Sequence, residues 1–539
     1  MIKPSNLTHN KVNKTEQTLW PVPFLLPERR EMKGIEEELR AWMEQNGSSY
    51  VPMDQFETKQ TDGLQEAVKE ERVIVIPWHK KTYLTLPEIR VKEEFCAKEI
   101  VARSSVEKTV GMASLDVIAP LINKYEEENS MAFSDEQRQG IEMICNSHFC
   151  VLTGGPGTGK TSVLKCAAEV IKKTAGRRVT LNFTSPTGKA AKRITESSGY
   201  EASTLQSYTG GFGGAPIQLK APDVMFVDES SMMDLDTLFV MLQCLYPCTK
   251  IVLIGDTEQL PSVGIGSVLR DLIDSDAVRF TQLIKTFRQD ESSTLFENIQ
   301  NVKMGGALPL KNGSDFNFIQ EEEDAKIKEC CIKAYLESVE RFGISETAVL
   351  TPYRKKGALC SDALNRELQA LVNPNGKAFK AHVFRDDYSL DVTYRVGDPV
   401  IQLVNRKGLA NGEVGTVIDI NDGRVMVRFP DTLMSYWKKD LDALDLAYAL
   451  SIHKSQGSEY KSVIMPLSKN HRNLSRNLIY TGLSRAKKYC TVIGSYEVIR
   501  EACDKQADLE RGTFLVEEIQ NQLYQMALKM AVIKLHNWS

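Results

Sequence analysis

The sequence predicts an α/β protein with two parallel-sheet domains, a mostly helical N-terminal domain and a small inserted β-barrel. Three observations predict this fold class. Apolar strands alternate with amphipathic helices in two runs, one over about 131–280 and one after residue 281, as in parallel sheets. A glycine-rich turn joins an early strand of the first run to the helix that follows it. Short strands with a tight hairpin interrupt the second run at about 394–430, which indicates an insertion.

The bulk composition is typical of a globular chain with several domains. Its 539 residues allow three or four domains, and an apolar fraction of 42% is enough for real cores. The net charge of −4 gives no overall basic signal, although a local groove can still be basic. The eleven cysteines are scattered and odd in number, which favours a reducing, cytoplasmic location. We find no signal peptide and no apolar run of membrane length, so we expect no membrane partner.

Residues 1–130 are predicted to form an N-terminal arm and a small domain. Three prolines and little periodicity indicate an extended arm over residues 1–33. The pattern then predicts three helices, at Ile35–Gln45, Asp62–Glu71 and Glu88–Arg103, and two strands, at Arg72–Ile76 and Lys81–Leu86. Such a unit is similar to a winged-helix domain, but a packing domain without any ligand fits the pattern equally well.

The first α/β domain is predicted over residues 131–280. Ser134 is expected to cap a helix that continues to about Asn146 and carries acidic residues in its first turn. Four apolar strands follow and end at Gly154, Thr184, Asp228 and Gly255, with helical stretches between them. This order predicts a parallel sheet whose ligands bind beyond the carboxyl ends of the strands.

The stretch from Phe149 to Ser162 carries the strongest chemical signal. An apolar strand ends in G-x-x-x-x-G-K-T, and a helix starts at about Lys160, which is the order of a phosphate-binding loop. Its glycines let backbone N–H groups turn toward an anion at the positive end of the new helix. Lys160 can reach the β- and γ-phosphates, and the Thr161 hydroxyl can ligate Mg²⁺. We expect the nucleotide to contact the whole loop: Gly154, Gly155, Pro156, Gly157, Thr158, Gly159, Lys160, Thr161 and Ser162.

Polar residues follow the other strands of this domain. Asp228 is suited to the Mg²⁺ shell, and Glu229 to orienting or deprotonating the attacking water. Gln259 follows the next strand, and its amide could bond both a phosphate oxygen and a water; a simple polar turn is the alternative. The turn Ser185–Lys189 carries small hydroxyls and a lysine, which suit a phosphodiester backbone, although a solvated loop is an equal alternative.

The second α/β domain is predicted over 281–393 and 431–539, on either side of the insertion. Arg288 and Arg485 belong to this domain, and an arginine that crosses a cleft to a γ-phosphate stabilises transition-state charge. The insertion contains the turn Asn421-Asp422-Gly423 between two alternating strands, a strong hairpin signal. Arg424 and Arg428 lie on one face of the second of these strands. We therefore expect a small barrel that clamps nucleic acid.

Taken together, these motifs resemble those of superfamily 1 helicases of the B type, closest to the RecD-like DNA helicases. The resemblance covers about residues 60–500 and keeps the order and spacing of the motifs. It rests on Phe133–Gln137, Thr187–Arg193, Val227–Met232, Gly255–Gly264, Leu350–Tyr353 with Leu364-Asn365, Ser451–Glu459 and Tyr480–Lys487.

The resemblance implies two RecA-like motor domains that couple ATP hydrolysis to 5′–3′ movement on single-stranded DNA and at DNA forks, with replication or repair proteins as candidate partners. Gln137 would contact adenine, and Gly457 and Glu459 would lie near the nucleotide. The catalytic residues would be Lys160, Glu229, Gln259, Arg288 and Arg485. The DNA path would include Pro186, Thr187, Lys189, Pro352, His453 and Ser455.

Two departures from the family pattern leave the function open at particular points. Thr204-Leu205-Gln206 stands where relatives usually have Thr-Ile-His, and the strand-separating hairpin is replaced by the short, glycine-rich segment 210–216. One alternative is therefore a DNA-stimulated translocase, or a subunit of a recombination complex, that unwinds little by itself. A regulatory DNA-binding module with an idle nucleotide site is another, but the intact catalytic set argues against it.

Overall fold

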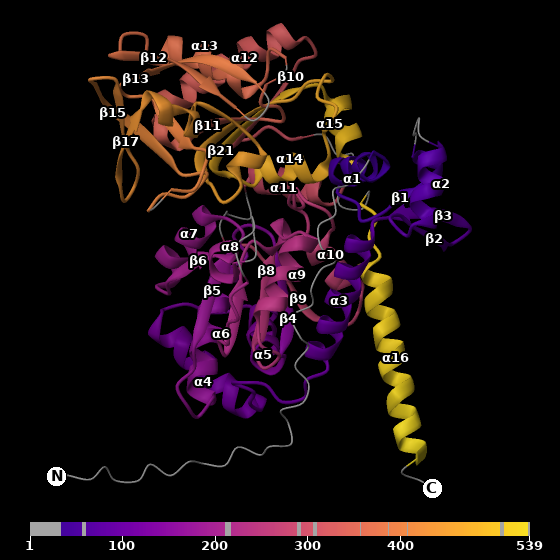
Figure 1. Cartoon of the computed structure of the whole chain (residues 1–539). Helices are drawn as coiled ribbons and strands as arrows, with labels where there is room; N and C mark the ends of the chain where they lie inside the picture. The colour runs from indigo at the N-terminus through magenta and orange to yellow at the C-terminus, as the bar shows by residue number, and fades with distance from the viewer. Residues whose placement is uncertain are drawn as a thin grey trace, which may run out of the picture.

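The computed structural model describes residues 34–56, 61–210, 217–287, 293–305, 310–355, 357–385, 388–406, 408–506 and 511–536. Two α/β domains lie one above the other, with a small domain and a long C-terminal helix at one side (Figure 1). Both large sheets are parallel, so the prediction of a parallel α/β fold is confirmed. None of the described helices combines the length and apolar character that a membrane span requires.

The first α/β domain has a six-stranded sheet in the order β6-β5-β7-β8-β4-β9. Its strands are β4 (Phe149–Gly154), β5 (Leu181–Ser185), β6 (Ala202–Thr204), β7 (Val224–Val227), β8 (Lys250–Gly255) and β9 (Arg279–Leu283). Its helices are α4 (Leu115–Glu128), α5 (Asp135–Asn146), α6 (Lys160–Thr174), α7 (Gly188–Ser198), α8 (Leu205–Thr209), α9 (Leu235–Cys244) and α10 (Val268–Asp274), with the 3₁₀ turn η2 (Ser230–Met232). Ser134 caps α5, as predicted, and also forms a capping box with Gln137.

Strand alternation divides the core of this domain between the two sheet faces. Phe149 and Val151 of β4 belong to one apolar cluster, which includes α9 and α10. Cys150 and Leu152 belong to the other, with α5 and α6. Because successive side chains of a strand point to opposite faces, a strand that is covered on both faces must be apolar on both, and the first four residues of β4 are all apolar and buried.

The second α/β domain has a five-stranded parallel sheet in the order β10-β21-β20-β11-β19. Its strands are β10 (Phe316–Gln320), β11 (Thr347–Thr351), β19 (Ala449–Ser451), β20 (Tyr460–Pro466) and β21 (Ala486–Gly494). Its helices are α11 (Thr294–Lys303), α12 (Asp324–Phe342), α13 (Ser361–Val372), α14 (Arg476–Leu483) and α15 (Tyr496–Cys503), with the 3₁₀ turns η3 (Ile344–Glu346) and η5 (His453–Ser455).

The insertion forms antiparallel strands that extend beyond the predicted 394–430. A hairpin, β12 (Ala378–Phe384) and β13 (Ser389–Arg395), precedes a five-stranded sheet in the order β17-β16-β15-β14-β18. These strands are β14 (Pro399–Gln402), β15 (Val414–Asn421), β16 (Arg424–Arg428), β17 (Leu433–Trp437) and β18 (Leu444–Leu446), with the 3₁₀ helix η4 (Lys438–Ala443). Within the described part of the chain no pairing joins the edges β17 and β18, so this sheet is open and the predicted barrel is not confirmed.

The N-terminal residues form a small sheet and three helices close to the predicted positions. The elements are α1 (Ile35–Asn46), β1 (Val51–Pro52), η1 (Met53–Gln55), α2 (Thr61–Lys69), β2 (Ile74–Trp78), β3 (Lys81–Thr85) and α3 (Pro87–Ser104). Helix α3 packs on the first α/β domain: Arg103 is buried and donates to the carbonyls of Leu245 and Tyr246 at 2.8 and 3.0 Å. The predicted arm over residues 1–33 lies outside the described residues.

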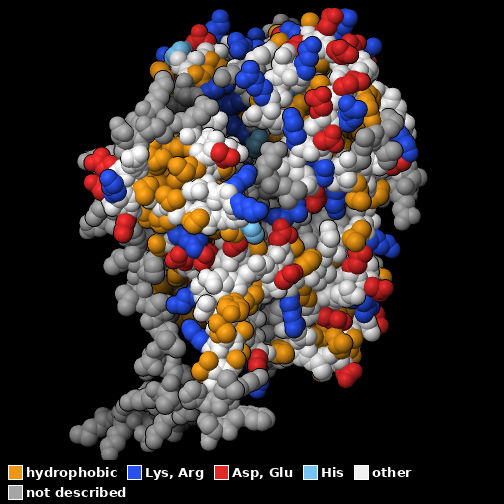
Figure 2. Space-filling model, turned by 90° about the vertical axis from the view of Figure 1, so that its right-hand side faces the viewer, with side chains coloured by type: hydrophobic (Ala, Val, Ile, Leu, Met, Phe, Trp, Pro, Cys, Tyr) orange, Lys and Arg blue, Asp and Glu red, His pale blue; other side chains and the backbone are white. Residues whose placement is uncertain are grey.

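The chain returns from the second domain to the N-terminal side. Helix α16 (Leu515–His536) runs along α3, and the Phe514 ring packs against those of Tyr50 and Trp78 at centroid distances of 4.5 and 5.6 Å. Figure 2 views the molecule from this side and shows a broad hydrophobic area in its upper half, beside a hollow with lysine and arginine side chains.

Candidate functional site

The glycine-rich loop lies between β4 and α6, at the carboxyl edge of the first sheet. Gly157 and Gly159 have φ values of 77° and 81°, which only glycine adopts readily, and a Cβ at Gly159 would meet the Gln137 side chain at 2.4 Å. Lys160 Nζ donates to the carbonyls of Gly154 and Gly155 at 2.6 and 3.0 Å. The loop thus holds an ammonium group and the N-terminus of α6 in one small space, a combination that suits a nucleotide polyphosphate.

Gln137, the predicted adenine contact, already uses both ends of its amide within the protein. Its oxygen accepts from Ser134 N and its Nε2 donates to Thr158 O, both at 2.9 Å, and its side chain is buried. The structure therefore gives Gln137 a role in fixing the phosphate loop on α5. Its contact with adenine stays a prediction.

The acidic pair follows β7, where the sequence predicts a metal site. Glu229 N donates to Asp228 Oδ1 at 2.8 Å, and Glu229 has a φ of 54°, a left-handed conformation that is unusual for glutamate. Removal from water raises the pKa of Asp228, and the Glu229 charge raises it further. A nearby divalent cation would stabilise the ionised carboxylate, and with the Thr161 hydroxyl the donor set is all oxygen, which fits Mg²⁺.

A set of buried hydrogen bonds connects the two α/β domains beside this loop. Arg485 Nη2 donates to Gln259 Oε1 at 2.9 Å, and Gln259 Nε2 donates to Asp256 Oδ2 at 3.1 Å. Tyr480 Oη, from α14, donates to the same Asp256 oxygen at 3.0 Å. Gln259 and Arg485, predicted separately as γ-phosphate contacts, therefore form one cluster across the cleft.

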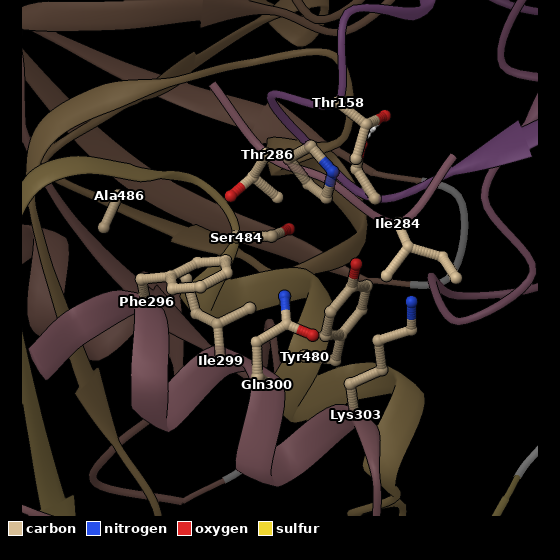
Figure 3. A pocket seen from close by; sticks show the side chains of 12 residues that line it. Thr158, Ile284, Thr286, Phe296, Ile299, Gln300, Lys303, Tyr480, Ser484 and Ala486 are labelled. Atoms are coloured by element: carbon tan, nitrogen blue, oxygen red, sulfur yellow. Dashed lines mark hydrogen bonds between the residues drawn. The ribbon is translucent and has the colours of Figure 1, made fainter. Parts of the chain in front are cut away.

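A pocket opens between the phosphate loop and the second domain. Figure 3 shows Thr158 on one side and Tyr480, Gln300 and Lys303, from α14 and α11, on the other. The motif analysis did not single out Gln300 or Lys303, because they lie on a helix with no recognisable pattern. Tyr480 and Asp256 lie within the motifs Tyr480–Lys487 and Gly255–Gly264, and this position in a motif is the signal that could have identified them. Arg288 lies outside the described residues.

A groove with many cationic side chains crosses both α/β domains and the insertion. Pro186, Thr187 and Lys189 line it from the first domain, and His453 lines it from the second. Four of its cations belong to no sequence motif and were not predicted: Arg354, Arg385, Arg406 and Lys439. Lys454 lies within the motif Ser451–Glu459 but was not expected to line the DNA path. Pro352 lines a second cavity with Lys355 and Arg472, and Arg354 lines both.

Of the predicted DNA contacts, Ser455 is buried and Lys189 is half-buried. Ser455 is fully buried, and its hydroxyl donates to Ile452 O at 2.7 Å, so it does not face the groove. Lys189 Nζ donates to the Ser458 hydroxyl and, at 3.4 Å, to Gly412 O. Burial lowers the pKa of Lys189 to about 8. Lys189 therefore lies at the junction of the two domains and lines the groove from there.

Gly457 and Glu459 lie against α7. Gly457 approaches Ala190, and the Glu459 carboxylate pairs with Arg193 and with Lys487, the latter at 3.1 Å. These contacts place both residues on the α7 side of the second domain. Their expected proximity to the nucleotide stays a prediction.

Two family models match parts of this chain. A model described as an AAA domain matches residues 132–324, and a model of the UvrD-like helicase C-terminal domain matches residues 446–493. Among solved structures, a Pif1 helicase studied at forked double-stranded DNA is similar to 67% of this chain and 92% of its own, with 20% identity and a TM-score of 0.43.

Curated relatives point to one family. The chain is 32% identical over 393 residues to the ATP-dependent RecD2 DNA helicase of Deinococcus radiodurans, covering 72% of this chain and 52% of that protein, so it spans about half of that relative's length. It is 28% identical over 419 residues to the RecBCD enzyme subunit RecD of Mycolicibacterium smegmatis, covering 69% of this chain and 73% of that one. With the motifs in the same order, these matches show that the chain belongs to the RecD-like family of superfamily 1 helicases.

Proposed function

We propose that this chain is an ATP-dependent DNA helicase that moves 5′ to 3′ along single-stranded DNA and separates duplexes at forks. The observation that carries the proposal is the contact between Gln259 and Arg485, which joins the phosphate-loop domain to the second domain. A group held by both domains at the cleft can make cleft closure depend on the γ-phosphate. The names of the relatives, ATP-dependent DNA helicase and RecBCD subunit, support the same activity.

At the cleft, each side chain has a role that its position supports. Lys160 and the loop N–H groups would hold the β- and γ-phosphates, and Thr161 with Asp228 would hold Mg²⁺, which neutralises phosphate charge when bound. Glu229 would take a proton from the attacking water. Arg485 would stabilise charge on the γ-phosphate, with Gln259 beside it as the sensor.

Single-stranded DNA would occupy the groove that crosses both α/β domains. The cations Arg406 and Lys439 from the insertion and Lys454 from the second domain face it together with Thr187 and His453. Phosphate contacts of this kind give affinity without sequence preference, as a translocating enzyme requires. The polarity of movement is supported by the family resemblance alone.

We also propose a division of the chain that follows the sequence: an N-terminal winged-helix-like domain to about 130, a first RecA-like motor domain over 131–280, and a second one over 281–393 and 431–539. The inserted β unit at 394–430 would extend to about 446, because β17 and β18 pair within its sheet. We propose that it acts as a clamp on the DNA.

A translocase with little unwinding activity is the second candidate. The antiparallel bridge between Gly210 and Ile217 leaves only six residues at the place of the family's strand-separating hairpin. A segment of six residues offers little surface to divide a duplex. In that case the chain would act with partner proteins, as a subunit of a repair or recombination complex.

Two measurements test these proposals. Phosphate release from ATP and Mg²⁺, with and without a dT oligonucleotide, should show strong stimulation by the DNA. Strand displacement should then be measured on duplexes with either a 5′ or a 3′ tail. Preference for the 5′ tail is the expected result; stimulated ATPase without displacement would favour the translocase, and preference for the 3′ tail would refute the proposed direction.

A further inference from the structure

A phenylalanine, Phe384, stands exposed at the end of β12, on the face of the strand that also carries Lys380 and His382. Ala381 and Val383 of this strand are buried, whereas Lys380, His382 and Phe384 are exposed. The Phe384 side chain is 63% exposed. A single exposed apolar residue is ordinary on a protein surface, so its meaning depends on what surrounds it.

Phe384 lines the cationic groove that crosses both α/β domains. Thr187 and Lys189 face the same groove from the first domain, and Arg406 and Lys439 from the insertion. Lys439 is exposed and makes no ion pair or hydrogen bond with the described residues. The groove therefore combines free positive charge with an aromatic ring, the two features by which proteins hold single strands without reading sequence.

The backbone at Phe384 is fixed to the insertion sheet by its neighbour, Arg385. The Arg385 side chain is only 3% exposed, and its guanidinium donates to the carbonyls of Asp442 and Leu444 at 2.8 and 2.9 Å. Phe384 N itself donates to Asp442 Oδ1 at 2.7 Å. A buried arginine with this many acceptors acts as a rigid anchor, so the exposed ring is held in place.

The Phe384 ring is also supported from its own strand. The His382 ring packs against it edge to face, with centroids 5.2 Å apart and planes at 85°. His382 Nδ1 lies 2.8 Å from Asp391 Oδ1 on β13, which holds the imidazole in turn. Preorganisation of this kind lowers the entropic cost of a stacking contact.

We propose that Phe384 is a stacking platform for a base of single-stranded DNA in this groove, and that Arg385 is the residue that positions it. The proposal rests on the proposed function, since it requires a strand in the groove. Every base has a π-face, so one aromatic ring can hold each base in turn while the cations follow the phosphates.

The test is the affinity for a fluorescein-labelled dT oligonucleotide, measured by anisotropy over a series of salt concentrations. Phe384→Ala should weaken binding about 5- to 150-fold, the range that loss of a stacking aromatic gives, whereas Phe384→Trp should bind like the parent. The control is Phe280→Ala, a phenylalanine on β9 that is 45% exposed and outside the groove lining. The slope of the logarithm of the binding constant against the logarithm of the salt concentration (the salt slope) should be the same for Phe384→Ala as for the parent. Lys439→Ala should reduce the magnitude of this slope by about one.

A second measurement locates the contact along the strand. An abasic residue moved through the oligonucleotide should weaken binding by the parent most at one position, and at that position the loss should vanish in Phe384→Ala. Parent protein that fails to bind dT would overturn the proposed function itself. Parent protein that binds, with Phe384→Ala equal to it in affinity and in the abasic scan, would overturn only the stacking site. A third outcome would also overturn the proposal: Phe384→Ala melts at a lower temperature than the parent, and Phe384→Trp binds dT as weakly as Phe384→Ala does. That result would assign the ring a structural role.

Discussion

Replacing Arg485 by alanine should slow ATP turnover far more than it weakens ATP binding. The side chain is 3% exposed, and its Nη2 bonds Gln259 Oε1 while its Nε bonds Thr481 O at 3.2 Å. The amide oxygen of Gln259 and the carbonyl oxygen of Thr481 thus hold the guanidinium at the cleft. Such an arginine addresses charge that develops in the transition state.

The expected magnitude follows from this geometry. Loss of an arginine that stabilises the transferred phosphoryl group lowers kcat by about 10³-fold, which corresponds to roughly 4 kcal/mol of transition-state stabilisation. Arg485→Lys should recover little of this, because an ammonium cannot keep both the Gln259 and Thr481 contacts. Arg485→Ala also leaves the buried Gln259 Oε1 without this donor, which should lower the free energy of unfolding by about 1–3 kcal/mol.

The assay is steady-state phosphate release at saturating dT over a series of ATP concentrations, with nucleotide affinity measured separately by a fluorescent ATP analogue. Arg341→Ala, an exposed arginine on α12, is the matched control and should behave like the parent. Unchanged kcat with a large loss of affinity would refute the reasoning, since it would make Arg485 a ground-state contact.

Three further predictions concern the phosphate loop, the acidic pair after β7 and the insertion. Lys160→Ala should abolish ATP turnover and leave the melting temperature unchanged. The reason is that the Lys160 ammonium is partly exposed and, among the described groups, bonds only loop carbonyls. Turnover near the parent rate would exclude the phosphate-loop assignment. Glu229→Gln should keep ATP and DNA binding and lose about 10²–10⁴-fold in turnover, since an amide cannot take a proton; failure to bind nucleotide would indicate a structural role. Replacing both Arg424 and Arg428 by alanine should lower dT affinity and reduce the salt slope by up to about two without changing DNA-free ATPase, and an unchanged slope would argue against the clamp.

Local chain chemistry was sufficient to predict the two parallel sheets and the residues at their edges. The runs Phe149–Leu152 and Val224–Val227 are apolar at every position, so the sequence alone indicates that both belong to central strands. The insertion was harder, because β18 is short and joins the sheet only through pairing with β14, which lies about 40 residues earlier in the chain. Strand pairing of this kind has no local signal in the sequence.

The candidate site shows the same limit at the level of single side chains. The Gln259 and Arg485 positions follow from motifs, but their mutual contact depends on how two domains meet. Arg385 and Lys439 have no motif, and they join the groove only through the fold of the insertion. Ser455 lies within a strong motif and is nevertheless turned inward, since a motif fixes the backbone and leaves open which atoms reach the surface.

Helix α7 offers a physical route between the nucleotide cleft and the DNA groove. It carries three cations toward the second domain and the insertion: Lys189 bonds Ser458, Lys192 pairs with Glu413 at 2.8 Å, and Arg193 pairs with Glu459. The two ion pairs, of Lys192 and Arg193, are partly exposed and contribute about 1 kcal/mol or less each, so they can break and form again in every cycle. The buried contact between Gln259 and Arg485 lies across the same domain boundary. We infer that opening the cleft after hydrolysis would separate α7 from its partners at the same time, which would change the grip on the DNA strand without any separate signalling element.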